Sequence, residues 1–503
     1  MPFVATTKTG KKPTQKPPSG SPLTRDEWDG IGEVSRKWIY KTAAEAGKNS
    51  HNSSLPPSRD SSKEKAKTNS KKKRRRGKRR KPGGQPGHPA HQRPLVPPEL
   101  VDDQVDHFPA ECRRCGREFD DSDHELDCEV VHHQVAEIPE IRPSVTDHLR
   151  HRMTCPDCAT TTTAELPDGV PTSCFGPNLR ALVVMLAGRY RISRRETADL
   201  CKSVFGLSVS VGSIANILER ASRALKAPYD EVDAAVKSAP VAYMDETGWR
   251  QKGKGIHLWI LVSTLCVLFR IGRRTKKVAQ EMLGEDYCGT LVTDRYAAYR
   301  WMPDWLHQVC WAHLDRDFEK LIEAGGAGKT IGKALRKVRN DLFSVWHAYK
   351  DGCIRWETMQ RRMIQVEIRA GEVLAAGTRC RDPAAKRLCK SLLRIEASLF
   401  VFARIEGVEP TNNIGERGIR PAVQWRKICF GTQSLDGSSF VERILTVVAT
   451  CRMQNRSPLA YLQQVLVAKD CGDEIPSLLS EGTAQRPRSA ASQPTDKRLR
   501  QAG

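Results

Sequence analysis

Between residues 239 and 310, apolar residues occur in short runs that end at turn signals or at acidic residues, as is typical of strands. The expected strands are Val241–Asp245, Ile256–Ser263, Leu265–Ile271, Leu291–Asp294 and His307–Cys310. Gly253 and Gly255 fall in the first turn, and a helix is expected near Lys276–Leu283. The first three runs are close enough in the sequence to form an antiparallel meander. The pattern therefore predicts an α/β domain.

Two other stretches follow the helical period. In residues 177–226, one shared apolar face is made by Leu179, Leu182, Val183 and Leu186, and another by Ile214, Ile217, Leu218 and Ala221. A Gly-containing turn at Gly206 separates two of these helices, so the stretch is either a helix-turn-helix that reads DNA or a packing module. Residues 314–403 are predicted to be almost wholly helical, with Leu335, Val338, Leu342 and Val345 on one face.

The charge of the chain is concentrated near its beginning. The net charge is +23, and residues 1–100 contain 24 Lys/Arg and 8 Asp/Glu, which leaves +16 in the first fifth of the 503 residues. Residues 1–98 are also poor in large apolar side chains and are expected to be disordered. Within them lies a basic tract, Lys71, Lys72, Lys73, Arg74, Arg75, Arg76, Lys78, Arg79 and Arg80. This tract is either a solvated tail or an arm that binds nucleic-acid phosphates, and we favour the arm.

Composition excludes several classes of protein. No run approaches the ~20 apolar residues that a membrane-spanning helix needs, and the beginning of the chain lacks a secretory apolar stretch. Sixteen cysteines in 503 residues are too dilute for a disulfide scaffold. The sequence therefore predicts a cytoplasmic protein with no membrane partner.

Four cysteines form two Cys-x-x-Cys pairs, Cys112 with Cys115 and Cys155 with Cys158. Two such knuckles that bracket a hairpin supply the four thiolates of a structural Zn²⁺ site. Residues 130–149 alternate in places as strands do and are expected to form the hairpin. A redox dithiol is the alternative, although it usually has a single pair. We therefore predict a small zinc-binding β domain.

Three acidic residues occupy distinctive positions. Asp245 and Asp294 each end an apolar strand, and Glu416 begins a basic helix. Carboxylates on rigid strand ends are suitable ligands for hard cations, and two aspartates with a later glutamate suit a two-metal centre with ions roughly 3.5–4 Å apart. This order is typical of nucleases and transposases of the ribonuclease H architecture, with Mg²⁺ or Mn²⁺ as the two catalytic ions.

Six segments, in a fixed order, carry a resemblance to a known family. They are Lys81-Pro-Gly-Gly-Gln-Pro-Gly-His, the paired knuckles, Tyr243-Met-Asp-Glu-Thr, Asp294-Arg-Tyr-Ala-Ala-Tyr, Cys310-Trp-Ala-His and Asn412-Asn-Ile-Gly-Glu-Arg-Gly-Ile-Arg-Pro. Over roughly residues 72–455 the chain resembles the transposases of insertion sequences of the sixty-six class. The resemblance implies a DDE-type enzyme whose ribonuclease H-like core carries Asp245, Asp294 and Glu416. Arg295 departs from the family, in which Gly often follows the second Asp.

Each catalytic assignment has a structural alternative. Asp245 can bond a turn, Asp294 can cap the following helix, and Glu416 has the spacing of a capping box with Asn413. Glu246 is expected on the opposite face of the strand and is not assigned. His313, with Arg316 nearby, either orients a phosphate or caps and packs, and it is not assigned as a metal ligand.

Basic residues surround the glutamate, and Arg417, Arg420, Arg426 and Lys427 are predicted to face DNA phosphates. The expected function is cleavage of element ends and joining of their 3′-hydroxyls to target DNA. The alternatives are a zinc-containing DNA-binding protein with an inactive core, and a plain metal-dependent nuclease. The expected partners are DNA, further copies of the chain on that DNA, and accessory transposition proteins.

The sequence thus predicts seven segments along the chain. They are a disordered basic arm (1–98), a zinc-binding domain (99–170), a helical segment with a candidate helix-turn-helix (171–235), the first part of the core (236–318), a helical insertion (319–403), the second part of the core with the glutamate helix (404–455) and a C-terminal tail (456–503).

Overall fold

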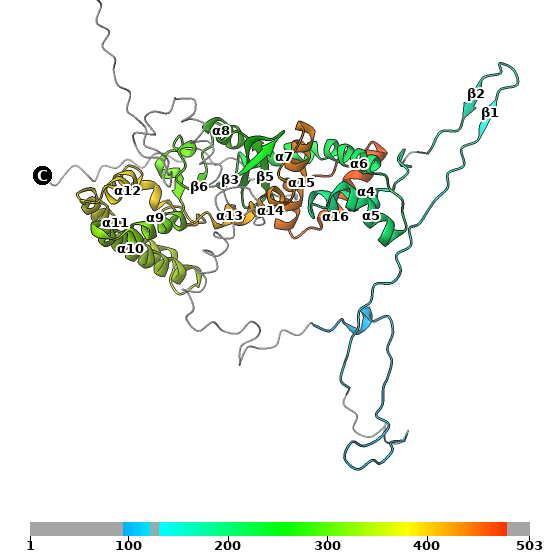
Figure 1. The fold of residues 1–503 in the computed structure, drawn as a ribbon, viewed down its shortest axis with the longest axis horizontal. Helices are drawn as coiled ribbons and strands as arrows, with labels where there is room; N and C mark the ends of the chain where they lie inside the picture. Colours follow the sequence, from blue (N-terminus) through cyan, green and yellow to red (C-terminus); the bar gives the residue numbers. More distant parts are fainter. Residues whose placement is uncertain (1–93, 121–122, 124–129, 168, 480–503) are drawn as a thin grey trace, which may run out of the picture. The chain divides into compact units, whose positions relative to one another are not determined.

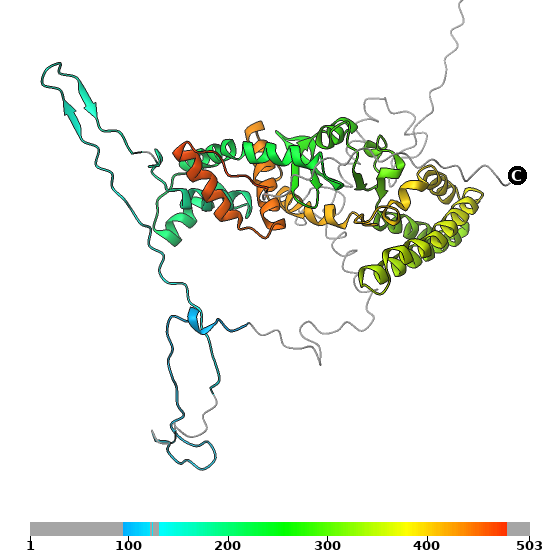
Figure 2. The same cartoon turned by 180° about the vertical axis from the view of Figure 1, so that it is seen from behind.

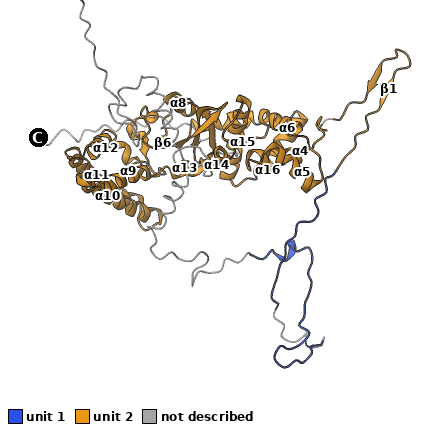
Figure 3. Ribbon diagram, viewed as in Figure 1, with its two compact units in different colours: residues 1–144 blue, residues 145–503 orange. Residues whose placement is uncertain are grey.

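The computed structural model describes residues 94–120, 123, 130–167 and 169–479. These residues belong to two compact units, 1–144 and 145–503, and each is described by itself (Figure 3). The boundary falls inside the range 99–170 that was predicted as one domain. The basic tract at 71–80 lies outside the described residues.

The described residues of the first unit contain a short turn, a paired contact between residues 38 positions apart, and one bridge. A 3-10 turn, η2, spans Pro98–Leu100. The Gln134 amide donates to the carbonyl of Val96 and accepts its N–H, at 3.0 and 2.7 Å. An antiparallel bridge joins Glu111 to Glu118 around the first cysteine pair.

The prediction of strands within residues 130–149 is wrong, because the structure describes all of these residues and assigns no strand there. The apolar positions of the alternating pattern stay exposed, for example Val131 at 85% and Val135 at 79%. Alternation stabilises a strand only where one face is buried and a neighbour pairs with it. The short hairpin instead flanks the second cysteine pair, with β1 (Arg152–Thr154) antiparallel to β2 (Thr161–Thr163).

Helices precede the main sheet of the second unit. They are α4 (Pro177–Gly188), α5 (Arg194–Phe205), α6 (Val211–Ala224) and α7 (Lys226–Val236). A capping box of Ser193 and Glu196 begins α5, and Gly206, with φ 65°, ends it in the left-handed region that glycine tolerates. The Ser210 side chain caps α6. The helices expected in residues 177–226 are therefore present, and the helix-turn-helix stays a prediction.

A five-stranded sheet follows, and its strand order is β5-β4-β3-β6-β7. The strands are β3 (Val241–Gln251), β4 (Lys254–Val262), β5 (Val267–Gly272), β6 (Thr290–Thr293) and β7 (His307–Val309). β3, β4 and β5 form the antiparallel meander, whereas β6 is parallel to β3 and β7 is parallel to β6. Helix α8 (Lys276–Leu283) lies on the connection between β5 and β6. The predicted α/β class is confirmed.

One predicted strand boundary is wrong. β3 does not end at Asp245 but continues to Gln251, because its second half pairs with β4 through the turn at residues 252–253. The pairing of β3 with β6, by contrast, extends only from Val241 to Tyr243. Asp245 therefore lies in the middle of a strand, just beyond the point at which that strand loses its neighbour on one side.

The helical region after the sheet is present as predicted. It contains α9 (Trp311–Ala324), α10 (Gly326–Lys350), α11 (Trp356–Thr378) and α12 (Pro383–Leu393), followed by 3-10 turns at Glu396–Leu399 and Val401–Ala403. Figures 1 and 2 show α10, α11 and α12 on one side of the sheet and α4, α5 and α16 on the other.

The chain then returns to the sheet through α13 (Asn413–Gly418), α14 (Arg420–Cys429), α15 (Leu435–Met453) and α16 (Pro458–Cys471). Side chains of α15 satisfy the outer edge of β5: Thr446 accepts from the N–H of Phe269, and Thr450 from that of Val267. This covers an edge that would otherwise expose unpaired N–H groups. Helix α16 packs on α4, so the range 456–503, expected to be a tail, begins as a packed helix.

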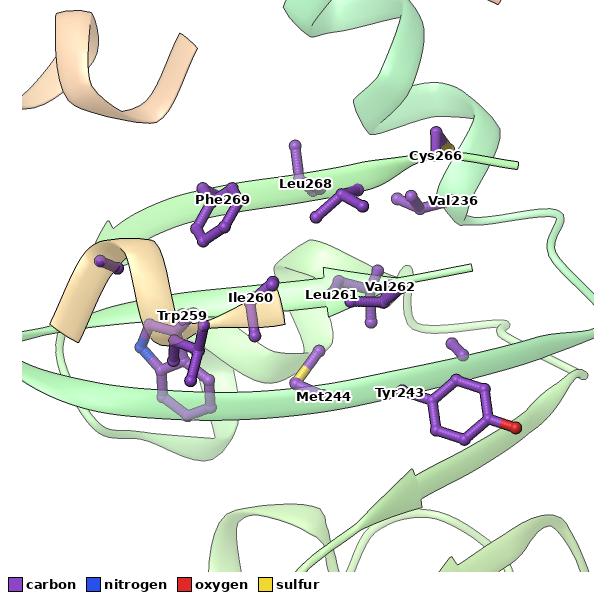
Figure 4. Close-up of a cluster of buried hydrophobic side chains, with 14 of the residues drawn as sticks. Val236, Tyr243, Met244, Trp259, Ile260, Leu261, Val262, Cys266, Leu268 and Phe269 are labelled. Carbon is purple, nitrogen blue, oxygen red and sulfur yellow. The ribbon is translucent and has the colours of Figure 1, made fainter. Parts of the chain in front are cut away.

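One hydrophobic cluster joins the sheet to the helices on both sides of it. Figure 4 shows Met244, Ile260 and Leu261 gathered between neighbouring strands, with Phe269 on the next strand. The side chains of Met244 and Trp259 are fully buried. This core fixes the backbone on which the acidic residues stand.

Candidate active site

Asp245 and Asp294 come from neighbouring parallel strands. The register pairs Tyr243 with Val292. This is the last pair of the register, and Asp245 and Asp294 each follow it by two residues. The pairing of β3 with β6 therefore brings the two chain segments that carry the predicted aspartates to the same edge of their contact.

The environment of Asp245 is that of a crowded carboxylate. Burial raises the pKa of its carboxyl to about 7, and the negative charges of Glu246, Asp294 and Glu416 add to the rise. A hydrogen bond from the N–H of Glu246, at 2.9 Å, acts in the opposite direction. The repulsion shows that both other predicted catalytic residues lie within electrostatic reach of Asp245, and a bound cation would relieve it.

Asp294 lies directly after β6. Its Oδ1 accepts the N–H of Tyr296 at 2.8 Å, which closes a local turn. The 3-10 turn that follows, η4 (Ala297–Tyr299), has Tyr296 as its N-cap and no side-chain cap hydrogen bond. Asp294 therefore does not cap a helix, and only its Oδ1 takes part in the local turn.

Glu416 stands on α13, which packs against β3 and β4. The contact is close: a Cβ on Gly418 would approach Cδ1 of Ile260 to 2.7 Å. The N-cap of α13 is Asn412, not Asn413, and it makes no side-chain cap hydrogen bond. The capping-box alternative for Glu416 is therefore wrong, because the helix begins after Asn412 rather than Asn413 and no side-chain cap bond is formed.

Asn412 is a residue that the sequence reasoning missed. It is 1% exposed, and its Nδ2 donates to the carbonyl of Met244 at 2.7 Å. Its own N–H donates to Sγ of Cys310 at 3.1 Å. Asn412 thus ties the helix of Glu416 to the strand of Asp245 at the residue before that aspartate. The available signal was an Asn-Asn pair directly before the helix of Glu416.

The carboxylate of Glu416 also faces α9. Nδ1 of His313 lies 3.4 Å from one oxygen, and Arg316 lies 3.7 Å from the other. Within the described part of the chain, one group of three or more candidate metal ligands has all its ligand atoms within 4.8 Å of one another: Cys310, His313 and Glu416. The Cys-x-x-His motif therefore lies directly beside the glutamate.

Glu246, the residue after Asp245 on β3, has partners of its own. It pairs with Arg274, and it accepts the hydroxyl of Tyr299 at 2.6 Å. Its carboxylate is therefore neutralised by its own partners. This agrees with its exclusion from the predicted site.

Arg295, the residue that departs from the family pattern, pairs with Asp317 of α9 at 2.5 Å. Its guanidinium thus has a partner within the protein and holds the loop after Asp294 against α9.

The predicted basic residues lie on α13 and α14. Arg426 donates to the carbonyl of Gly248 on β3 at 3.2 Å, and burial lowers its pKa. Arg417 bonds the carbonyl of Asn413, one turn earlier in its own helix. Arg420 and Lys427 are exposed. None of the four has an acidic partner among the described residues.

A second group of arginines escaped the sequence reasoning, namely Arg189 and Arg191 after α4 and Arg452 near the end of α15. Burial and the charges of Arg452 and Arg191 lower the pKa of Arg189. Nε of Arg189, and Nε and Nη1 of Arg191, are buried without a hydrogen-bond partner in the described structure. Uncompensated guanidinium groups that repel one another indicate a place for an external anion.

Both cysteine pairs have the same backbone turn. The N–H of Cys112 bonds the carbonyl of Arg117, and the N–H of Cys155 bonds that of Thr160, each at 2.9 Å. The residue after each pair, Gly116 or Ala159, has a positive φ and donates its N–H to the first cysteine of its pair. Each knuckle taken alone therefore has the compact turn of a two-thiolate metal ligand.

Backbone hydrogen bonds also act on the thiols of both pairs. They lower the pKa of Cys112, mainly through the N–H groups of Arg114 and Cys115, whereas the side chain of Thr160 is the first cause at Cys158. Thiolate stabilisation of this kind suits metal binding.

Comparisons with known proteins identify the family of the chain. A family model described as "Transposase IS66 family" matches residues 172–440, more than half of the chain, so the chain belongs to that family. A second model, of a family of unknown function, matches residues 33–94.

Two relatives from Sinorhizobium fredii (strain NBRC 101917 / NGR234) bear the names uncharacterized protein y4hP and uncharacterized protein y4qI. The first is 24% identical over 67% of each chain, and the second is 27% identical over 39% of each chain. The family membership makes the chain a DNA-processing enzyme with a transposase function.

No helix in the described residues is long and apolar enough to span a membrane.

Proposed function

We propose that this chain is a DDE transposase with a ribonuclease H-like core, which cleaves the ends of its element and joins the 3′-hydroxyls to target DNA. The observation that supports it most is that the negative charges of both Asp294 and Glu416 act on Asp245, at the end of the paired part of β3 and β6. The strand order, with a three-stranded meander followed by two parallel strands, supports the ribonuclease H-like assignment.

The residues present fit two Mg²⁺ or Mn²⁺ ions, because the site offers oxygen ligands and the negative charges of neighbouring carboxylates act on the buried Asp245. Bound there, the ions would activate the attacking water or 3′-hydroxyl and neutralise charge on the phosphate. The protein's own task is positioning: Asp245 and Asp294 stand on a rigid sheet, and Asn412 fixes the helix that carries Glu416.

DNA binding in this proposal rests on cations without acidic partners among the described residues. One group lies on α13, the helix of Glu416, and on the next helix, α14; it consists of Arg417, Arg420, Arg426 and Lys427. Arg189, Arg191 and Arg452 form a further uncompensated group. The basic tract at residues 71–80 would add affinity that does not depend on sequence.

The full-length chain should be assayed with Mg²⁺ and DNA that carries the inverted repeats flanking its coding region. We expect cleavage at the repeat ends and joined products with a target duplex. Nicks without joining would indicate a plain nuclease. DNA binding without any cleavage would indicate a DNA-binding protein with an inactive core.

Structural Zn²⁺ bound by Cys112, Cys115, Cys155 and Cys158 stays a proposal of the same kind. It is supported by the sequence spacing and by the matching turns of the two knuckles. Metal analysis of the purified chain decides it.

A further inference from the structure

The catalytic glutamate of the proposed function has neighbours that the two-metal centre does not use. Cys310 follows β7 and is the N-cap of α9, and His313 lies in the first turn of that helix. Their ligand atoms and the carboxylate of Glu416 all lie within 4.8 Å of one another. Sulfur, nitrogen and oxygen ligands thus converge at one point beside the active site.

The distances suit a common ion. In tetrahedral coordination with Zn–N and Zn–O bonds of about 2.0–2.1 Å, nitrogen and oxygen ligands lie ~3.4 Å apart. Nδ1 of His313 and Oε1 of Glu416 are 3.4 Å apart, and both are buried without a hydrogen-bond partner in the described structure. The other carboxylate oxygen is oriented toward Arg316 at 3.7 Å. The unpartnered oxygen and nitrogen therefore face each other as two ligands do.

Cys310 has the surroundings of a metal-bound thiolate. Its side chain is fully buried at the N-cap of α9. The N–H of Asn412 lies 3.1 Å from the sulfur. Backbone N–H groups directed at sulfur stabilise a thiolate once a metal has displaced its proton to solvent.

We infer that Cys310, His313 and Glu416 form a binding site for one thiophilic transition-metal ion of the Zn²⁺ class, distinct from the hard-cation centre but sharing Glu416 with it. Thiolate and imidazole ligands favour Zn²⁺ or Co²⁺ and disfavour Mg²⁺. An ion bound here withdraws Glu416 from Asp245 and Asp294. This consequence rests on the proposed function and makes zinc an inhibitor of the Mg²⁺-dependent reaction, whereas binding itself does not depend on that function.

Binding is tested with the full-length chain. Its zinc content is measured first, and Zn²⁺ is added up to one ion per chain to fill the proposed knuckle site. Co²⁺ is then added in the presence of excess Mg²⁺, and the thiolate-to-cobalt charge-transfer absorption is recorded. We expect one further ion per chain with this absorption. It should disappear in Cys310→Ala and weaken at least about tenfold in affinity in His313→Gln.

Cys389→Ala is the matched control, because Cys389 is equally buried but lies on α12. It should bind Co²⁺ as the wild type does. Thermal melting identifies any variant that fails to fold, and His313→Gln then carries the test without loss of a buried thiol. An absorption that Cys310→Ala retains, or its absence from the folded wild type, would overturn the site.

Inhibition is tested separately in the DNA cleavage assay, with each variant compared with its own rate without added zinc. The zinc concentration that halves the rate should rise at least about tenfold in His313→Gln. Equal zinc sensitivity would overturn the competition for Glu416. A chain that binds Co²⁺ as expected but cleaves no DNA would instead overturn the proposed function and leave the metal site standing.

Discussion

The carboxylate end of the sheet and the cysteine knuckles both present metal-type ligands, but they hold them by different means. Asp245 lies on β3 directly after Met244, whose side chain is fully buried. Glu416 lies on α13, which packs against β3 and β4. The knuckles are local turns, and Cys115 and Cys158 are exposed. A hydrophobic core can hold repelling carboxylates before any ion arrives, whereas turns with little core depend on their metal.

The largest expected effect comes from substitutions that remove a carboxylate of the proposed catalytic site and leave the fold intact. Asp245→Asn, Asp294→Asn and Glu416→Gln each remove an anionic ligand, so each should lower cleavage and joining by on the order of 10³-fold or more. Melting and DNA binding should stay close to wild type, because the amides keep the shape. Cleavage of end-containing DNA with Mg²⁺ measures this effect.

Glu246→Gln is the matched control, since Glu246 is the next carboxylate on β3 but pairs with Arg274. It should retain most activity. Robust activity in Glu416→Gln would show that the catalytic glutamate has been wrongly assigned.

The second prediction breaks the knuckles and spares the sheet. Cys112→Ser or Cys155→Ser should lower the zinc content by one ion per chain and make residues 99–170 sensitive to protease. The temperature of the main melting transition should not change, because none of the four knuckle cysteines belongs to the hydrophobic core around the sheet. Metal analysis and limited proteolysis provide the readouts, and wild-type zinc content in both variants would contradict the prediction.

The third prediction sharpens the role of the core through His307. Burial lowers the pKa of this histidine to about 4, and its ring pairs with the Thr293 hydroxyl at 2.8 Å. The unfolded chain therefore takes up the proton first, near pH 6.5. The stability due to neutral His307 is complete above that pH and is lost as the pH falls toward 4, by about 3 kcal/mol.

His307→Gln should remove that part of the pH dependence. Denaturant unfolding between pH 7 and pH 4 measures the difference in slope between variant and wild type. Parallel curves would mean that the ring is protonated in the folded state without cost.

The smallest expected effect concerns DNA affinity. Arg189→Gln, Arg191→Gln and Arg452→Gln should each reduce the slope of log affinity against log salt by about 0.9 if the arginine contacts one phosphate. Arg369→Gln is the control, because Arg369 pairs with Asp341 at 2.5 Å. A slope that changes equally in the control would exclude a dedicated phosphate contact.

The sequence predicted a large part of this molecule because much of the information is local. The strand runs, α8 and the long helices follow from the spacing of apolar residues, and Asp245, Asp294 and Glu416 were selected from their settings. The predictions failed where pairing, and not the local pattern, decides the outcome. Residues 130–149 alternate but form no strand, whereas β3 continues past Asp245 because β4 pairs with it.

By itself, therefore, the sequence determined which residues carry the acidic, basic and thiol chemistry and which elements bear them. Only the tertiary structure decided that Asp294 lies within electrostatic reach of Asp245, since the parallel β3–β6 pairing joins strands that are separated by two others in the chain. It also brought Glu416 to the site from 122 positions beyond Asp294, placed Cys310 and His313 next to it, and gave Glu246 partners of its own. The reason is that local periodicity fixes which face of an element is apolar, whereas the burial of those faces against distant segments fixes which side chains meet.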